Sequence, residues 1–228
     1  MQREIITTSD GSSTIYLPEL NEHYHSKHGA IAEAQHVFLK MGLDHYRRLH
    51  PNQSEIKILE IGLGTGLNAL LTYFYSKDKN TNIYYTGLEA YPVCVEELQK
   101  LNYFERIPGI NSQESKTIFD SLHKSNWEVA TAITPCFTLV KKQISFLEFT
   151  PKTTHDIIYF DAFGPRVQPE LWTDDLLNTM YNSLNKNGVF VTYCAKGSVR
   201  RTLVSLGFEV ERLEGPPGKR EMLRATKK

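Results

Sequence analysis

Short apolar runs alternate with stretches of helical periodicity along most of the chain from residue 56 onward. Apolar runs of this length, bounded by glycine or polar residues, predict buried strands, and the segments between them have helical length and spacing. The predicted strands cover 56–61, 82–89, 136–140, 155–161 and 188–194. The predicted helices cover 65–76, the segment after Pro92, 173–184 and 197–206. This alternation predicts a parallel sheet with helices on both faces.

The end of the chain departs from this alternation. Residues 207–215 and 219–226 predict two strands, and Pro216-Pro217-Gly218 between them predicts a loop. The segment 104–135 has only weak hydrophobic periodicity, so no helix or strand is assigned to it. The expected fold class is therefore an α/β sheet that is mostly parallel and carries an antiparallel strand pair at its C-terminal end.

Residues 1–55 differ in composition from the rest and are predicted to be an N-terminal extension packed on a main domain of residues 56–228. Six of the eight histidines lie in this extension. Apolar residues at helical spacing predict a helix over 30–49. The histidines closest together are His23, His25 and His28. Because no HExxH motif or cysteine partner accompanies them, no metal site is predicted.

Composition and charge exclude several classes of protein. Lys plus Arg and Asp plus Glu both number 26, so a nucleic acid would have to be bound by a local patch and not by the overall charge. The three cysteines are too widely spaced for a disulfide framework or a thiolate zinc site. No apolar run approaches the ~18 residues of a membrane span, so a cytoplasmic protein without membrane contact is expected.

A glycine-rich turn lies where the first predicted strand meets the first predicted helix. In Glu60-Ile61-Gly62-Leu63-Gly64-Thr65-Gly66 the missing side chains let backbone N–H groups and a helix N-terminus approach a ligand. A GxGxxG motif for a nicotinamide cofactor would need glycine at 67, where this chain has leucine, so the turn favours S-adenosylmethionine. Glu89 ends the second strand, where an acid can accept hydrogen bonds from ribose hydroxyls. The alternative is a tight turn without a ligand and a solvated acid.

Asp161 ends the fourth predicted strand, at the edge where open α/β sheets bind ligands. Phe163, Pro165 and Trp172 follow in a rigid aromatic segment suited to the rim of a pocket. The alternative is that Asp161 caps a turn, as aspartate often does beside glycine and proline. If Asp161 acts on a substrate, its replacement should lower activity and leave stability nearly unchanged.

Five segments together resemble the methyltransferase domain of the bacterial tRNA 5-methylaminomethyl-2-thiouridine biosynthesis enzyme. They are HSKHGAIAEAQHVFL (25–39), LEIGLGTGLNALL (59–71), DAFGPRVQPELWT (161–173), TYCAKGSVRRTLVSLGFEV (192–210) and GPPGKREML (215–223). The resemblance implies the Rossmann-like fold of class I S-adenosylmethionine methyltransferases. The candidate cofactor contacts are then Glu60, Gly62, Gly64, Gly66, Asn68, Glu89 and Gln143. Gln143 is included because Lys142-Gln143 stand where the family tends to have Gly-Asp near the adenine.

The resemblance implies methylation of the amine of 5-aminomethyl(-2-thio)uridine at the wobble position of tRNA. In the bifunctional version of the enzyme, a flavin-dependent oxidase domain first removes a carboxymethyl group. This chain has no second glycine fingerprint and is expected to be the stand-alone form. A separate oxidase or upstream tRNA-modification enzymes would then supply its substrate.

Methyl transfer to an amine depends chiefly on alignment of the reactants. An alkylamine has a pKa of ~10.4, and an ordinary carboxylate is a poor base for its ammonium form. Asp161 is therefore the candidate catalytic residue in an electrostatic role, orienting the amine and stabilising the charge that develops on its nitrogen.

Other functions are compatible with the same motifs. A polyamine-synthase-like aminopropyl transferase usually needs an Asp in the glycine turn, where Thr65 stands here. Another small-molecule amine methyltransferase is a second alternative. A catalytically silent tRNA-binding module is a third, and the presence of Asp161 and Glu89 argues against it.

Basic residues gather in the last part of the chain. Residues 196–228 contain nine basic and four acidic side chains, a local net charge of +5. Lys196 and Arg200 follow the fifth strand on the same edge as Asp161, where they could guide tRNA phosphates toward the cleft. The alternative is a solvated face with a charged tail. The candidate substrate-binding residues are Phe163, Pro165, Trp172, Lys196, Arg200, Lys219 and Arg220.

Overall fold

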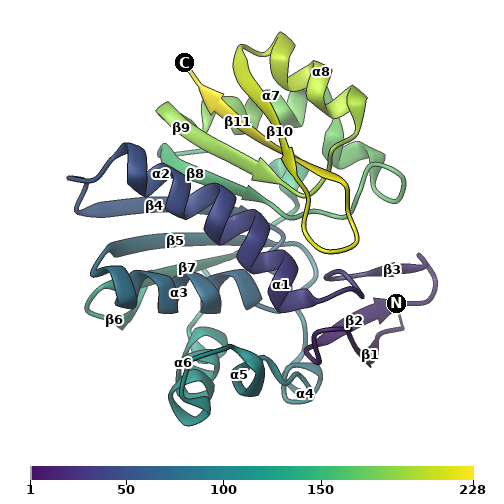
Figure 1. Cartoon of the computed structure of the whole chain (residues 1–228), viewed down its shortest axis with the longest axis vertical. Helices are drawn as coiled ribbons and strands as arrows, with labels where there is room; N and C mark the ends of the chain where they lie inside the picture. The colour runs from purple at the N-terminus through teal and green to yellow at the C-terminus, as the bar shows by residue number, and fades with distance from the viewer. Residues whose placement is uncertain (1) are drawn as a thin grey trace.

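The computed structural model describes residues 2–228, which form one eight-stranded and one three-stranded sheet (Figure 1). The large sheet has the strand order β10-β11-β9-β8-β4-β5-β7-β6. Its five central strands are parallel: β4 (Glu55–Ile61), β5 (Asn82–Glu89), β7 (Phe137–Gln143), β8 (His155–Phe160) and β9 (Leu184–Thr192). The antiparallel strands at its edges are β10 (Phe208–Glu214), β11 (Glu221–Lys227) and β6 (Thr131–Thr134). The predicted fold class is therefore confirmed.

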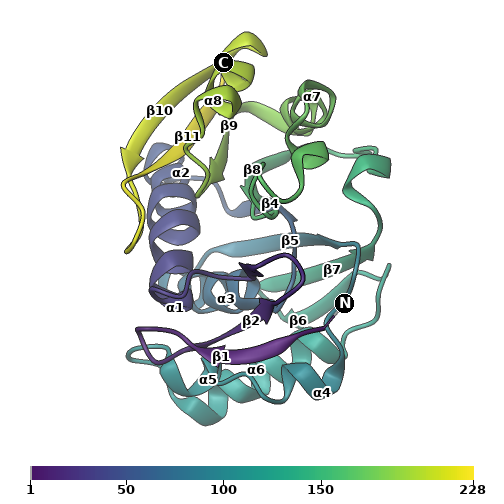
Figure 2. The same ribbon diagram turned by 90° about the vertical axis from the view of Figure 1, so that its right-hand side faces the viewer.

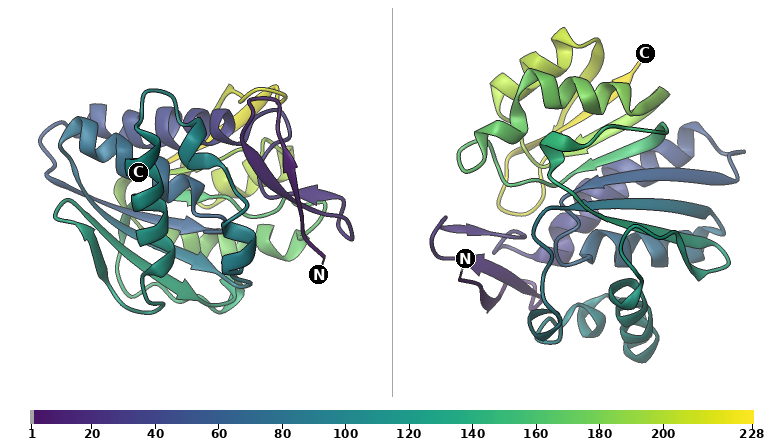
Figure 3. Two further views of the ribbon diagram at one scale, coloured as in Figure 1. Left: turned by 90° about the horizontal axis from the view of Figure 1, so that it is seen from below. Right: turned by 180° about the vertical axis from the view of Figure 1, so that it is seen from behind.

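Helices cover both faces of the large sheet. One face carries α1 (Ala30–Ala34), η1 (Gln35–Asp44) and α2 (His45–Leu49), which run on as a single helix beside α3 (Leu67–Lys79) (Figures 1 and 2). The other face carries α7 (Asp174–Asn182) and α8 (Gly197–Ser205) (Figure 3). Alternation along β4 serves both layers, because Ile58 joins the core on the first face while Leu59 and Ile61 join the core on the second. The apolar runs of the sequence are therefore buried on both sides.

The predicted helix over 30–49 is confirmed, and its central part is a π-helical stretch. Gly42 lets this helix approach the sheet closely, since an added Cβ would lie 3.1 Å from Val191 and 3.5 Å from Tyr159. Val37 and Phe38 are buried in the same core as the parallel strands. This part of the N-terminal region is thus integrated into the main core.

The segment between β5 and β7 differs most from the prediction. The helix expected after Pro92 is only the short α4 (Val95–Leu98), and α5 (Tyr103–Arg106) follows it. The longest element in the unassigned segment is α6 (Ser112–Lys124), and the side chain of its N-cap residue Asn111 accepts a hydrogen bond from the backbone N–H of Glu114. The apolar stripe of α6 is narrow, which explains its weak signal: its buried residues are Ser115, Ile118, Phe119 and Leu122.

Three short strands at the N-terminus were not predicted. They are β1 (Glu4–Thr7), β2 (Ser13–Leu17) and β3 (Glu22–His23), and they lie beyond the carboxyl ends of the parallel strands (Figure 1). Two to five residues of mixed polarity give too little alternation to identify a strand. Among residues 2–228, no helix has the length and apolar character needed to cross a membrane.

Candidate functional site

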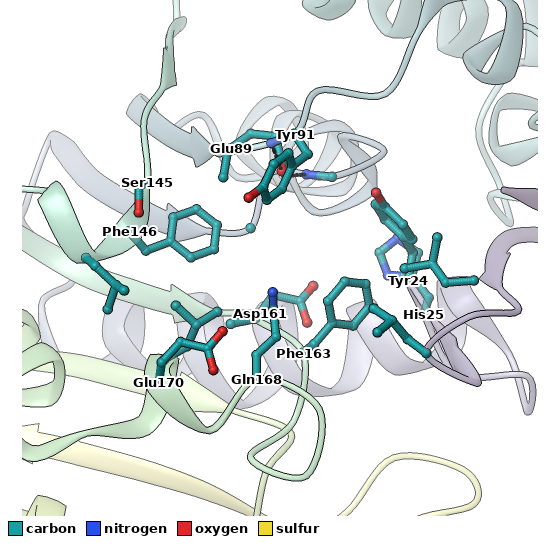
Figure 4. A pocket seen from close by; sticks show the side chains of 18 of the residues that line it. Tyr24, His25, Glu89, Tyr91, Ser145, Phe146, Asp161, Phe163, Gln168 and Glu170 are labelled. Atoms are coloured by element: carbon teal, nitrogen blue, oxygen red, sulfur yellow. Dashed lines mark hydrogen bonds between the residues drawn. The ribbon is translucent and has the colours of Figure 1, made fainter. Parts of the chain in front are cut away.

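A cavity of about 650 Å³ lies at the carboxyl edge of the parallel strands, and the N-terminal sheet closes one side of it (Figure 4). The strand order reverses at β4, between β5 and β8, which is the position where open α/β sheets bind ligands. The turns after β4, β5, β7 and β8 all contribute to the walls. The labelled residues around it are Tyr24, His25, Glu89, Tyr91, Ser145, Phe146, Asp161, Phe163, Gln168 and Glu170.

The glycine turn after β4 forms part of the cavity wall. Gly62, Gly64 and Gly66 have φ angles of 92°, 51° and 72°, a region that favours glycine. A Cβ on Gly62 would lie 2.7 Å from the backbone oxygen of Asp161, and one on Gly64 would lie 3.1 Å from the Tyr24 ring. Gly62 and Gly64 line the cavity, whereas Gly66 precedes α3 and faces away from it. The first two glycines are therefore required for the shape of the site.

Glu89 links two turns at the cavity wall. Its Oε2 accepts a hydrogen bond from the backbone N–H of Gly64 at 2.8 Å, and its Oε1 accepts one from that of Tyr91 at 2.9 Å. Each carboxylate oxygen can accept a further bond. The predicted ribose-binding acid therefore lies in the cavity and also holds the glycine turn against the turn after β5.

Asp161 lies directly after β8 and lines the cavity. Its Oδ2 accepts a hydrogen bond from Nδ2 of Asn68 at 2.8 Å. Burial, and then the neighbouring Glu33 carboxylate, raise the pKa of Asp161 from 3.8 to about 7, against the lowering effects of Asn68 and Lys219. The side chain is therefore divided between its acid and carboxylate forms near neutral pH, unlike an ordinary aspartate.

Glu60 and Asn68, both expected to contact the cofactor, lie beneath the cavity instead of lining it. Glu60 is 0% exposed, and its two carboxylate oxygens accept hydrogen bonds from Asn68 Nδ2 and from the Tyr85 hydroxyl, each at 2.8 Å. Asn68 is 1% exposed. Burial raises the pKa of Glu60 well above its ordinary value. The reason for this correction is tertiary, because β5 and α3 supply the partners that hold Glu60 inside the fold.

The N-terminal region lines the cavity with residues that were not predicted, among them Arg3, Tyr24 and His25. The Arg3 guanidinium pairs with Glu97 at 2.9 Å and donates to the backbone oxygen of Tyr91 at 2.9 Å, which fastens β1 to the turn after β5. Tyr24 packs edge-on against Phe163, and burial raises its pKa to about 12. His25 is buried against Thr65, and burial lowers its pKa to about 4. Nothing local in the sequence pairs these residues with the glycine turn.

Gln143 lies outside the cavity. The third predicted strand ended at residue 140, but β7 continues to Gln143, whose side chain is exposed and whose backbone N–H donates to Glu128 at 2.8 Å. The chain enters the cavity two residues later, at Ser145 and Phe146. The longer strand therefore leaves Gln143 outside the cavity, and Ser145 and Phe146 line it instead.

The aromatic segment after Asp161 is only partly in the cavity. Phe163 lines it, but Trp172 is buried in the core behind it, where its indole N–H donates to the Phe163 backbone oxygen at 2.8 Å. Pro165 is half-buried and does not line the cavity. Trp172 thus supports the Phe163 backbone from the core and does not line the cavity.

The predicted basic residues lie outside the cavity and differ in their surroundings. Lys196 is exposed and immediately precedes α8, and the half-buried Arg200 follows one turn later. Lys219 pairs with Glu33 at 2.5 Å and lies 3.6 Å from the centre of the Tyr193 ring, so its charge is largely engaged within the protein. Arg220 is exposed. Lys196, Arg200 and Arg220 therefore remain available to meet a ligand from solvent.

Comparisons with known proteins agree with this architecture. The model of a family described as S-adenosyl-L-methionine-dependent methyltransferase matches residues 113–228. The "tRNA 5-methylaminomethyl-2-thiouridine biosynthesis bifunctional protein MnmC" of Hydrogenovibrio crunogenus is 33% identical over 213 residues, covering 87% of this chain and 30% of that protein. The protein of the same name from Delftia acidovorans is 29% identical, covering 93% of this chain and 33% of that protein. The chain thus spans about a third of the length of these curated relatives.

Solved structures show the same fold. The crystal structure of MNMC2 from Aquifex aeolicus has a TM-score of 0.79 at 24% identity and covers 98% of this chain and 70% of that chain. A probable spermidine synthase from Corynebacterium glutamicum has a TM-score of 0.54 at 14% identity, covering 98% of this chain and 76% of that one. At these identities the likeness concerns architecture only.

The cavity fits the cofactor of this family. Its volume is within the ~300–1,000 Å³ of small-molecule sites. The glycine turn presents backbone without Cβ atoms, and the acids Glu89 and Asp161 suit a ligand that carries ribose hydroxyls and positive charge. The expected resemblance is confirmed by the relatives, which align over most of the chain. The chain belongs to the S-adenosyl-L-methionine-dependent methyltransferase family.

Proposed function

We propose that this chain methylates the amine of 5-aminomethyl(-2-thio)uridine at the wobble position of tRNA, giving the 5-methylaminomethyl form. The names of the curated relatives support this substrate. The observation that carries the proposal is the Asp161 carboxylate, which lies in the cavity beside the glycine turn with only Oδ2 engaged by another side chain of residues 2–228. Its Oδ1 is available to an amine.

The raised pKa of Asp161 extends the role expected from the sequence. S-adenosylmethionine supplies an electrophilic methyl group, and the amine must meet it with a free lone pair. Moving a proton from an ammonium of pKa ~10.4 to Asp161 at about 7 costs roughly 4 to 5 kcal/mol, against ~9 kcal/mol for an ordinary aspartate. Asp161 can therefore both orient the amine and accept its proton.

For the cofactor, we propose contacts with Gly62, Gly64 and Glu89 at one end of the cavity. The turn after β7, at Ser145 and Phe146, replaces Gln143 as the proposed adenine contact, because it lines the cavity and Gln143 does not. This assignment places the reacting methyl group toward Asp161.

For the substrate, we propose that Phe163 contacts the uridine and that Lys196 and Arg200 contact tRNA phosphates. Both basic residues follow β9, at the same sheet edge as Asp161. A separate oxidase or an upstream modification enzyme would supply the aminomethyl group, and the reaction would take place in the cytoplasm with its tRNA.

Mass spectrometry of nucleosides from tRNA incubated with the protein and cofactor tests this function. We expect one added methyl group on tRNA that carries 5-aminomethyluridine and none on tRNA that carries the carboxymethylaminomethyl form. The variant Asp161→Ala should be inactive. Transfer to free polyamines or other small amines without transfer to tRNA would replace the proposal by one of the small-molecule alternatives.

A further inference from the structure

Four side chains form a continuous hydrogen-bonded chain from the interior of the sheet to the cavity. The Tyr85 hydroxyl donates to Oε2 of Glu60, and Nδ2 of Asn68 donates one hydrogen to Oε1 of Glu60 and the other to Oδ2 of Asp161, all at 2.8 Å. These residues come from β5, β4, α3 and the end of β8. The chain ends on the carboxylate that lines the cavity.

The burial of this chain fixes the orientation of the Asn68 amide. Tyr85 and Glu60 are 0% exposed and Asn68 is 1% exposed. An amide has two N–H hydrogens, and here each meets a carboxylate oxygen. The Oδ1 of Asn68 is buried and has no hydrogen-bond partner among the described residues. Rotating the amide would place that oxygen against two carboxylates, so the arrangement with nitrogen toward both acids is favoured despite the unpaired Oδ1.

This fixed amide has a direct effect on Asp161. Asn68 engages Oδ2 of the Asp161 carboxylate, no hydrogen bond to Oδ1 comes from the described residues, and Asp161 lines the cavity. The titratable groups around Asp161 come from several elements: Glu33 on α1, Lys219 on the β10–β11 loop, Tyr193 after β9 and Glu60 on β4. Asn68 is the neutral side chain that hydrogen-bonds Asp161 directly.

We propose that Asn68, itself held by Glu60 and Tyr85, is a positioning residue that engages Oδ2 of Asp161 and thereby directs Oδ1 toward the substrate amine. This inference rests on the proposed function of Asp161. It assigns Glu60, the acid before the glycine turn, to the support of the acceptor carboxylate and not to contact with the cofactor.

The variant Asn68→Leu tests the inference because leucine has the same branched arrangement of side-chain non-hydrogen atoms and no donor. Turnover on aminomethyl-tRNA should fall at least 10-fold, while the Kd of S-adenosylmethionine stays within about twofold. The hydrogen bond from Asn68 lowers the pKa of Asp161, so its loss should move the acidic limb of the kcat profile to higher pH. Tyr85→Phe should give a smaller effect in the same direction, because it keeps the ring contacts with Phe137 and Tyr159.

Thr72→Val is the matched control. Thr72 is a buried polar residue on the same helix as Asn68, but it is not part of the hydrogen-bonded chain. This variant should therefore retain the parent pH profile. If Asn68→Leu weakens cofactor binding more than 10-fold and leaves kcat and its pH profile unchanged, Asn68 is a cofactor contact and the inference is wrong. If Asn68→Leu and Tyr85→Phe both leave turnover, its pH profile and the cofactor Kd unchanged, the hydrogen-bonded chain has only a packing role and the inference is wrong. Failure of the proposed function would be visible separately, as no methylation of aminomethyl-tRNA by the parent protein.

Discussion

Replacing Asp161 by asparagine should remove methyl transfer and, in contrast to the nearly unchanged stability expected from the sequence, should stabilise the protein. The carboxylate form of Asp161 is destabilised in the folded state, since burial and Glu33 raise its pKa from 3.8 to about 7. Asparagine carries no charge, and its side-chain oxygen can still accept the bond from Asn68. Turnover should fall ~100-fold or more, the effect of removing one electrostatic stabiliser.

The magnitude follows from the two pKa values. The folded state binds the Asp161 proton more tightly than the unfolded chain, so this group lowers stability as pH rises from about 4 to about 7. At about 1.36 kcal/mol per pH unit, the full penalty above pH 7 is about 4 kcal/mol. Because Asp161 lines the cavity, water can solvate its carboxylate and lower this penalty. Between pH 5 and pH 8, the stability advantage of Asp161→Asn should therefore grow by about 1 to 3 kcal/mol.

Urea denaturation of parent and variant at pH 5 and pH 8 measures this difference. Asp10→Asn provides a control of opposite sign. Burial raises the pKa of Asp10, but hydrogen bonds from Ser12, Thr8 and the Ala32 backbone outweigh it and lower the value. Its stabilising contribution is present above the ordinary pKa, so Asp10→Asn should destabilise at both pH values. A stability difference for Asp161→Asn that is the same at pH 5 and pH 8, or a less stable variant at pH 8, would refute the reasoning.

Three further changes test other parts of the site. Gly64→Val places a Cβ 3.1 Å from the Tyr24 ring at a φ of 51°, so calorimetry should detect no cofactor binding. The control Gly109→Ala also has a positive φ, 75°, but no atom lies within 4 Å of its added Cβ, so this variant should bind the cofactor normally. Arg3→Ala removes the link between β1 and the turn after β5. The cofactor Kd should rise roughly 5-fold or more, which corresponds to about 1 kcal/mol of binding free energy. An unchanged Kd would show that the N-terminal sheet is dispensable for binding. Arg200→Gln should reduce the magnitude of the slope of log K for tRNA binding against log salt concentration by roughly 0.7 to 0.9. The control Lys79→Gln, at the far end of α3, should leave this slope unchanged. Equal slopes for the two variants would place the tRNA surface elsewhere.

The order of the five parallel strands, the glycine turn and the position of Asp161 could all be predicted from the sequence. Each depends on neighbours in the chain: an apolar run gives a buried strand, a glycine-rich segment gives the turn, and the residue after the strand lies at the carboxyl edge. Weak local signals gave the errors in the fold. The narrow apolar stripe of α6 left 112–124 unassigned, and the polar end of β7 concealed that the strand continues to Gln143.

The roles of individual side chains were decided by contacts between distant segments. Glu60 precedes the glycines as a cofactor-binding acid would, yet Tyr85 and Asn68, 25 and 8 residues away, occupy both its oxygens. Tyr24 reaches the glycine turn from the segment directly after β3, with no local pattern to indicate it. The sequence thus determined where the carboxylate of Asp161 would lie. Only the tertiary structure determined its ionisation, because burial, the charges of Glu33 and Lys219 and the hydrogen bond from Asn68 set that pKa.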